Sequence, residues 1–159
     1  TRFRMAVMNF DEKEVAELIT DPNTIIALSD AGAHASQLCD ACYSTHLLGH
    51  WVRDRKVFTI EEAVHNLTQR PAEMFGITDR GVLAEGRPAD VVVFDPKTVN
   101  PGPLKRVHDM PAGADRLVSE ASGIEAVVVN GKLIRRNNKD TIPANDKLPG
   151  RLLRHGRAA

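Results

Sequence analysis

The sequence predicts an α/β fold that is followed by a small β module. Three observations lead to this prediction. A helix pattern near the amino terminus precedes a short, continuous apolar run, as expected for a strand buried on both faces of a parallel sheet. Two more helix patterns come next. After about residue 78, β-branched runs and a strong hairpin signal replace the helical periodicity.

The first helix is predicted to begin after Asp11, because Asp11 and Glu14 have the spacing of a capping box. Residues 24–28 (TIIAL) lie between turn-forming residues and are the predicted buried strand. A helix followed by a fully buried strand is the repeating unit of α/β sheets and barrels.

Two helices are predicted after this strand. The first extends over about residues 38–55, with its apolar residues at helical spacing. The second begins at Thr59, and Glu62 completes a capping box. Pro71 should end or kink this helix, and Gly76 should stop the short continuation that follows.

The patterns in the second half of the sequence predict strands. Residues 91–94 (VVVF) and 126–129 (AVVV) are β-branched runs, and Asn130-Gly131 is the strongest hairpin signal in the chain. Residues 96–123 are rich in Pro, Gly and charge, so we expect a long excursion with little regular structure there. The basic segment from residue 137 onward is expected to lie on the surface.

Composition restricts the possible partners. The 21 basic residues balance 21 acidic ones, so no overall charge favours nucleic acid or an anionic membrane. No run approaches the roughly 18 apolar residues of a membrane span. The amino terminus lacks the pattern of a secretory signal, and only two cysteines are present, which is typical of a reducing compartment. We therefore expect a cytoplasmic location, with no nucleic-acid or membrane partner.

Asp30 is the best candidate for chemistry. It follows the predicted strand directly, and α/β enzymes place catalytic groups at the carboxyl ends of their strands. The small residues after it would let a substrate or metal approach closely. The structural alternative is that Asp30 only begins a turn or caps the next helix.

Cys39 and Cys42 form a C-x-x-C pair, and His46 and His50 follow at helical spacing. A metal site and a redox pair are both possible interpretations. However, four ligands along one helix would extend over about 12 Å and could not surround one ion. Small, buried side chains at a helix–helix contact are the preferred interpretation of the two cysteines.

Several segments together resemble a known enzyme family. TIIALSDAGAH, CYSTHLLGHWVR, FTIEEAVHNLTQRPAEMFGI and DRGVLAEGRPADVVVFDP occur in the order found at the end of amidohydrolase-superfamily proteins, and EAVVVNGKLI is similar to a later hairpin of the family. The resemblance covers roughly residues 5–136. The SDAGAH and CYSTHLLGHWVR segments are most similar to N-acyl-D-amino-acid deacylases.

The resemblance implies a specific architecture. Residues 1–78 would be the end of a (β/α)8 barrel of the TIM type, with strand 8 and its flanking helices, and residues 79–159 would be a small β-sandwich domain and a carboxy-terminal tail. The remainder of the barrel is then expected upstream of residue 1.

The resemblance also implies hydrolysis of the amide bond of N-acyl-D-amino acids by a metal-activated water, with zinc as the cofactor. Asp30 would contact the metal and act as the proton shuttle. Ser29 and His34 are candidates for substrate binding, although Ser29 could cap the strand and His34 could be an ordinary loop residue. No His-x-His occurs, so the other metal ligands would lie outside this chain, and we expect the 159 residues alone to be inactive.

Two other functions stay open at this point. The chain could belong to another C–N hydrolase of the superfamily, similar to hydantoinases or dihydroorotases, because the ADVVVFD segment is shared by many of them. It could also be a non-catalytic remnant or an assembly module that keeps the end of the fold without its metal.

Overall fold

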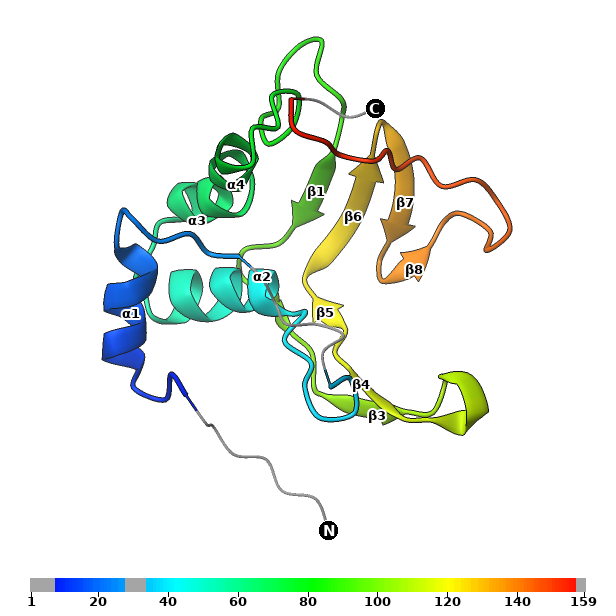
Figure 1. The fold of residues 1–159 in the computed structure, drawn as a ribbon, viewed down its shortest axis with the longest axis horizontal. Helices are drawn as coiled ribbons and strands as arrows, with labels where there is room; N and C mark the ends of the chain where they lie inside the picture. Colours follow the sequence, from blue (N-terminus) through cyan, green and yellow to red (C-terminus); the bar gives the residue numbers. More distant parts are fainter. Residues whose placement is uncertain (1–7, 28–33, 157–159) are drawn as a thin grey trace.

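A computed structural model of the 159-residue chain describes residues 8–27 and 34–156. The helices gather on one side and the larger sheet lies on the other (Figure 1). The helical segments are α1 (Glu12–Thr20), α2 (Tyr43–His46), the π-helix η1 (Leu47–Asp54), α3 (Ile60–Leu67), α4 (Gln69–Met74) and the short 3-10 turn η2 (Pro111–Gly113). Within the described ranges, no helix has the length and apolar character that crossing a bilayer requires.

All strands among the described residues belong to the second half of the chain. They are β1 (Val91–Phe94), β2 (Asn100–Pro101), β3 (Lys105–Val107), β4 (Arg116–Val118), β5 (Ala121–Ser122), β6 (Ile124–Val129), β7 (Lys132–Arg136) and β8 (Lys139–Asp140). One sheet has the order β1-β6-β7-β8, and two smaller ones pair β2 with β5 and β3 with β4. The mixed α/β class is confirmed, but the sheets of the described residues are antiparallel and do not close into a barrel.

The two helix starts lie where the capping signals predicted them. The Asp11 carboxylate accepts the backbone N–H of Lys13 at 2.9 Å. At the other start, the Thr59 hydroxyl accepts the Glu62 N–H at 3.2 Å, and the Glu62 carboxylate accepts the Thr59 N–H at 2.8 Å. All three contacts satisfy backbone N–H groups that have no partner inside the helix.

The predicted strand over residues 24–28 is wrong for its described part, since residues 24–27 are irregular. Thr24 instead folds back onto α1, and its hydroxyl donates to the Leu18 carbonyl at 2.7 Å. Ile26 packs against the buried cluster. A strand requires a hydrogen-bonded neighbour, and the described part of the chain places none beside residues 24–27.

The helix predicted from about residue 38 begins only at Tyr43 and continues as the wider η1. The next helix breaks earlier than predicted, at Thr68, whose φ and ψ are −129° and −80°. Pro71 explains this break, because its ring would clash with the carbonyl four residues earlier, that of Leu67. Gly76 then ends α4 with a positive φ of 64°, as predicted.

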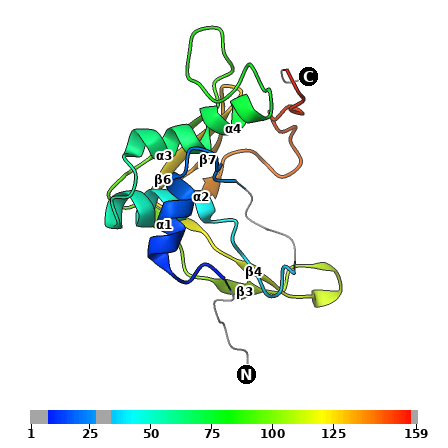
Figure 2. The same cartoon turned by 60° about the vertical axis from the view of Figure 1, so that its left-hand side comes forward.

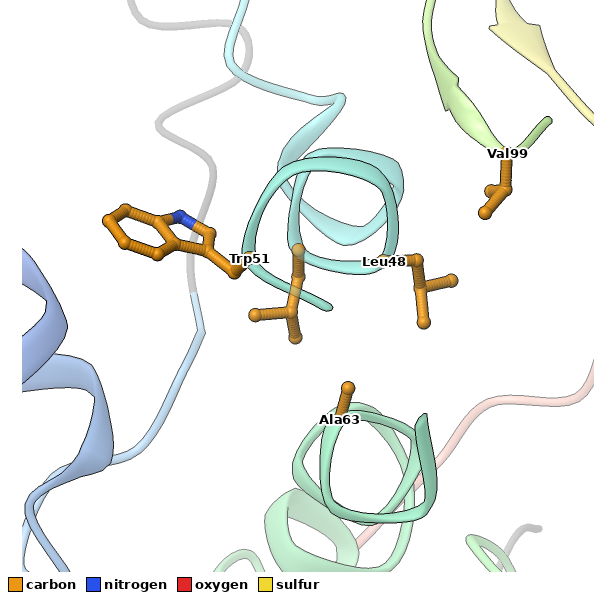
Figure 3. Packing of buried hydrophobic residues seen from close by; sticks show 5 residues of the cluster. Leu48, Trp51, Ala63 and Val99 are labelled. Atoms are coloured by element: carbon orange, nitrogen blue, oxygen red, sulfur yellow. The ribbon is translucent and has the colours of Figure 1, made fainter. Parts of the chain in front are cut away.

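The buried cluster joins helices to the β half of the chain (Figure 3). Leu48 and Trp51 of η1 lie on different sides of that helix, Ala63 approaches from α3, and Val99 lies just before β2. Ala63 and Val99 are fully buried. One cluster therefore includes residues from both sides of residue 78, and the division into domains at 78 stays a prediction.

The second half confirms one prediction and corrects another. Asn130 and Gly131 have φ values of 47° and 78° and join β6 to β7 in the predicted hairpin. Residues 96–123, predicted to be largely irregular, instead double back as an arm in which β2 pairs with β5 and β3 with β4. These pairings involve two or three residues each, which is too short to leave a periodic pattern in the sequence.

Arg80 links the loop before β1 to the β6–β7 turn. Its side chain is only 9% exposed, and its Nε lies 2.8 Å from an Asp90 carboxylate oxygen. A second guanidinium nitrogen donates to the Asn130 side-chain oxygen at 3.0 Å. The other Asp90 oxygen accepts the Asn130 N–H at 2.7 Å. One guanidinium therefore fixes two distant loops against each other.

We expect Arg80→Ala to lower the free energy of unfolding by about 2–4 kcal/mol, because it removes the nearly buried guanidinium that contacts both Asp90 and Asn130. Urea unfolding of the two proteins measures this. Arg135→Ala is the matched control: its ion pair with Asp140 is more exposed, so a loss below about 1 kcal/mol is expected. Equal losses in the two variants would contradict the role assigned to Arg80.

Candidate functional site

Two of the three predicted site residues, Ser29 and Asp30, lie outside the described residues. Their roles in substrate binding, metal binding and catalysis stay predictions. His34, the third, is the first described residue after them. The structure therefore shows the segment into which the predicted catalytic stretch leads.

His34 begins a tight turn. Its φ is 49°, and its carbonyl accepts the N–H groups of Gln37 at 2.6 Å and of Leu38 at 3.0 Å. The residue is exposed. A positive φ is uncommon for a residue with a side chain, although histidine is one of the types enriched there. The structure thus shows a locally hydrogen-bonded turn at residues 34–38, and the role of His34 toward substrate remains a prediction.

The turn is attached to the β3–β4 hairpin. The Leu117 N–H donates to the Ala35 carbonyl at 2.8 Å, and Arg106 Nη1 donates to the Ser36 carbonyl at 3.0 Å. Arg106 also forms an ion pair with Asp115 across the hairpin. Figure 2 shows the chain after the grey segment running beside β3 and β4. Two backbone carbonyls of the turn are therefore fixed by residues about 70–80 positions later in the sequence.

The two cysteines are free and half-buried. The Cys42 thiol lies 3.8 Å from the Cys39 carbonyl, and burial raises the pKa of this thiol. Residues 8–27 and 34–156 contain no group of three or more His, Cys, Asp or Glu side chains that could hold a metal ion. The C-x-x-C and the two histidines after it are thus not brought together as a metal site.

His46 and His50 stack on each other instead. Their rings are nearly parallel, with centroids 4.8 Å apart, and the His50 ring meets Trp51 edge-on. His50 Nε2 lies 3.0 Å from the Glu12 carboxylate, which also pairs with Arg55 at 2.6 Å. The cluster therefore ties η1 to α1, and it is a structural contact between two helices.

The lowered pKa of His46 makes the stability of the fold depend on pH. Desolvation, and then the neighbouring His50, lower the pKa of His46 from its ordinary value of 6.5, whereas Glu12 opposes this. The folded chain binds the His46 proton less readily than the unfolded chain. Neutral His46 thus contributes to the free energy of unfolding above pH 6.5. This contribution is lost as the pH falls toward the lower pKa that His46 has in the folded chain.

We expect the melting temperature of the wild type to fall more steeply between pH 7 and pH 5 than that of His46→Gln. Thermal unfolding at several pH values measures the two slopes. The control is His65→Gln, which alters a histidine on α3 outside the His46–His50 stack and should leave the wild-type slope unchanged. Identical slopes for wild type and His46→Gln would rule out His46 as a source of the pH dependence.

Comparison with known proteins identifies the family. The sequence profile of the amidohydrolase family matches residues 2–135, which is most of the chain. The chain belongs to the amidohydrolase family. This confirms the resemblance to the amidohydrolase family.

The relatives of this amidohydrolase chain include an N-acyl-D-glutamate deacylase and a D-aminoacylase. The chain is 41% identical over 110 residues to N-acyl-D-glutamate deacylase of Alcaligenes xylosoxydans xylosoxydans. This match covers 69% of this chain and 20% of the relative. The chain is 35% identical over 123 residues to D-aminoacylase of the same organism, covering 76% of this chain and 23% of the relative. The chain thus spans about a fifth of the length of these curated relatives.

A solved structure of N-acyl-D-glutamate deacylase from Bordetella bronchiseptica, complexed with zinc and a phosphonate inhibitor, is 40% identical in sequence to this chain. The match covers 57% of this chain and 17% of the Bordetella protein, with a TM-score of 0.45. The described residues of the present chain do not make a zinc site by themselves.

Sequence reasoning missed Arg106 and Leu117. Neither residue carries a motif, and both contacts join positions about 70 or more residues apart. The only sequence signal was the charge of the 96–123 segment, which does not say what its arginines bind. Arg80 and Asp90 lie within the recognised DRGVLAEGRPADVVVFDP segment, but their mutual contact was not predicted.

Proposed function

We propose that this chain is the carboxy-terminal portion of a metal-dependent amidohydrolase that hydrolyses the amide bond of N-acyl-D-amino acids. Membership of the amidohydrolase family supports the reaction class. The observation that carries the substrate class is the 41% identity over 110 residues with an N-acyl-D-glutamate deacylase. In this proposal, the part of the barrel that completes the active site precedes the present residues.

Asp30 is the proposed proton shuttle. A carboxylate that is ionised at rest can accept a proton from the attacking water. It can then return that proton to the departing nitrogen, which leaves as a neutral amine and not as an unstable amide anion. Zinc, when bound, supplies a lowered pKa for a coordinated water and keeps a nearby carboxylate ionised. Ser29 and His34 are proposed to contact the substrate.

The described residues support this proposal through position. The turn at residues 34–38 follows Asp30 closely in sequence. Within it, the His34 carbonyl accepts the N–H groups of Gln37 and Leu38, and the Ala35 carbonyl accepts the N–H of Leu117 in the hairpin. Groups that act in catalysis require such fixed surroundings, because small misplacements of reacting atoms lower the rate strongly.

A substrate panel tests the proposal. The complete enzyme, loaded with zinc, is given N-acetyl-D-glutamate, N-acetyl-D-methionine and their L-enantiomers, and released acetate is measured. We expect hydrolysis of D-substrates only, its loss after chelation and its return with zinc. Dihydroorotate and hydantoin are added as rival substrates: turnover of either in place of the acyl amino acids would contradict the deacylase proposal, and turnover of none would favour the non-catalytic alternative.

A further inference from the structure

An open hollow lies where three segments of the second half of the chain meet. It is lined by residues 86–89 in the loop before β1, by Asn130 and Gly131 in the β6–β7 turn, and by Arg151 in the carboxy-terminal segment. Its volume is about 410 Å³, and small-molecule sites in proteins typically have about 300–1,000 Å³. In Figure 1 the carboxy-terminal segment, drawn in red, passes the turn between β6 and β7. The proposed reaction assigns no role to this space, which we call the Arg87–Arg151 hollow.

Hydrogen bonds join the three segments that form its walls. The Gly131 N–H donates to the Ala89 carbonyl at 2.9 Å, which ties the β6–β7 turn to the loop before β1. The Asn130 side-chain amide donates to the Pro149 carbonyl at 2.7 Å, two residues before Arg151. The walls are therefore held together by the chain itself, and a ligand would not have to order them, which lowers the cost of binding.

The lining carries two positive charges and no negative one. Arg87 and Arg151 are its only ionisable residues. Within residues 8–27 and 34–156, Arg151 forms no hydrogen bond or ion pair, and Arg87 only donates to the Thr78 carbonyl. Of the carboxylates adjacent to the lining in sequence, Asp90 is bound to Arg80, and Glu85 does not line the hollow.

This local excess of positive charge is not a consequence of composition. The chain has 21 basic and 21 acidic residues, and six other arginines of the described ranges are paired with carboxylates. Acidic partners are thus plentiful in the fold, yet none is placed between Arg87 and Arg151. Two guanidinium groups that share an open space without a counter-charge favour an anion from solution.

Charge and shape both favour a phosphate group as that anion. A phosphate monoester carries about −1.5 to −2 charges at neutral pH, which matches two guanidinium groups better than the single charge of a carboxylate. The planar guanidinium also binds phosphate oxygens through two parallel hydrogen bonds. Nucleic acid is disfavoured, because the lining contains no aromatic side chain on which a base could stack.

We propose that the Arg87–Arg151 hollow binds the phosphate group of a small molecule, with the two arginines as its charged contacts. Gly86 and Gly131 leave room for this group, since nothing lies within 4 Å of a Cβ added to either residue. A phosphate can therefore approach the backbone of both loops. The inference goes beyond the proposed deacylase function and does not depend on it.

Isothermal titration of the complete protein with inorganic phosphate tests the proposal. We expect saturable binding that Arg151→Gln weakens by at least about tenfold, because a charge-assisted hydrogen bond is lost. Arg151 has no partner in the described part of the chain, so this variant should unfold at the wild-type urea concentration. Any phosphate held elsewhere in the complete protein binds equally in both proteins and does not affect the comparison.

The matched control is Arg154→Gln, which removes the same charge from the same segment outside the lining. Its affinity for phosphate should stay within about twofold of wild type, as expected for an exposed charge. Equal losses in Arg151→Gln and Arg154→Gln would overturn the proposal, since general attraction by the basic segment would then suffice. Absence of saturable binding, or an unchanged affinity in Arg151→Gln, would overturn it too.

Two further titrations identify the source of the phosphate group. Phenyl phosphate that binds at least about threefold tighter than inorganic phosphate would assign the hollow to an organic phosphate, whereas the reverse order would assign it to the free ion. Both results support phosphate recognition. Acetate, with a single charge, should bind at least about tenfold more weakly than phosphate, and equal binding of the two would refute the match to a doubly charged group.

Discussion

Replacing Asp30 by Asn is expected to lower kcat/KM of the complete enzyme for an N-acyl-D-amino acid by about 10²- to 10⁴-fold, the usual contribution of a general acid–base group. The amide of Asn has nearly the size of the carboxylate, but it cannot accept the proton of the attacking water and return it to the leaving nitrogen. Initial rates at saturating zinc measure the effect, because excess metal offsets any weaker metal binding.

The control is Asp40→Asn, which neutralises an exposed carboxylate ten residues later. It should leave kcat/KM within about twofold of wild type. Both variants should unfold at the wild-type urea concentration, which shows that lost activity does not reflect lost fold. An Asp30→Asn enzyme that retains more than about a tenth of the wild-type rate would remove Asp30 from the proposed mechanism.

Gly123→Ala is expected to lower the free energy of unfolding by at least about 3 kcal/mol. Gly123 joins β5 to β6 with a φ of 70°, a conformation that costs a residue with a side chain about 1–2 kcal/mol. An added Cβ would also lie 2.6 Å from the Cα of Val99 and 2.7 Å from the carbonyl carbon of Thr98. These are backbone atoms beside a fully buried valine, so they cannot move aside cheaply.

Gly131→Ala separates the two causes. Gly131 also has a positive φ, of 78°, but nothing lies within 4 Å of its added Cβ. We therefore expect only the conformational cost there, about 1 kcal/mol. Urea unfolding of both variants gives the comparison, and a Gly123→Ala loss no greater than the Gly131→Ala loss would show that the contact with Val99 is unimportant.

The features that sequence predicted correctly are those decided by a few neighbouring residues. Thr59 and Glu62 satisfy each other at a helix start, and Asn130-Gly131 makes a tight turn wherever two strands flank it. Gly76 stops a helix because it tolerates a positive φ. Such signals depend on local chemistry, so no knowledge of the remaining fold was needed.

The features that sequence could not predict depend on partners far along the chain. Residues 24–27 have the composition of a buried strand, but a strand forms only where another strand pairs with it. The pairings of β2 with β5 and of β3 with β4 join segments of two or three residues. Likewise, the Arg106 contact with Ser36 depends on the path of the 96–123 arm. The position of Asp30 after the predicted strand and the family resemblance pointed to Asp30, Ser29 and His34, but neither revealed what holds the turn at residues 34–38.

The arm at residues 96–123 leaves and re-enters the main sheet at one place. Asp95 donates its N–H to the Gly123 carbonyl at 2.8 Å, and Asn100 pairs with Ser122 directly beyond. Because these two ends already meet, lengthening or shortening the tip costs little additional loop-closure entropy. The tip is thus a segment that directed evolution can vary in length and sequence, altering the surroundings of the turn at residues 34–38 while the four-stranded sheet stays intact.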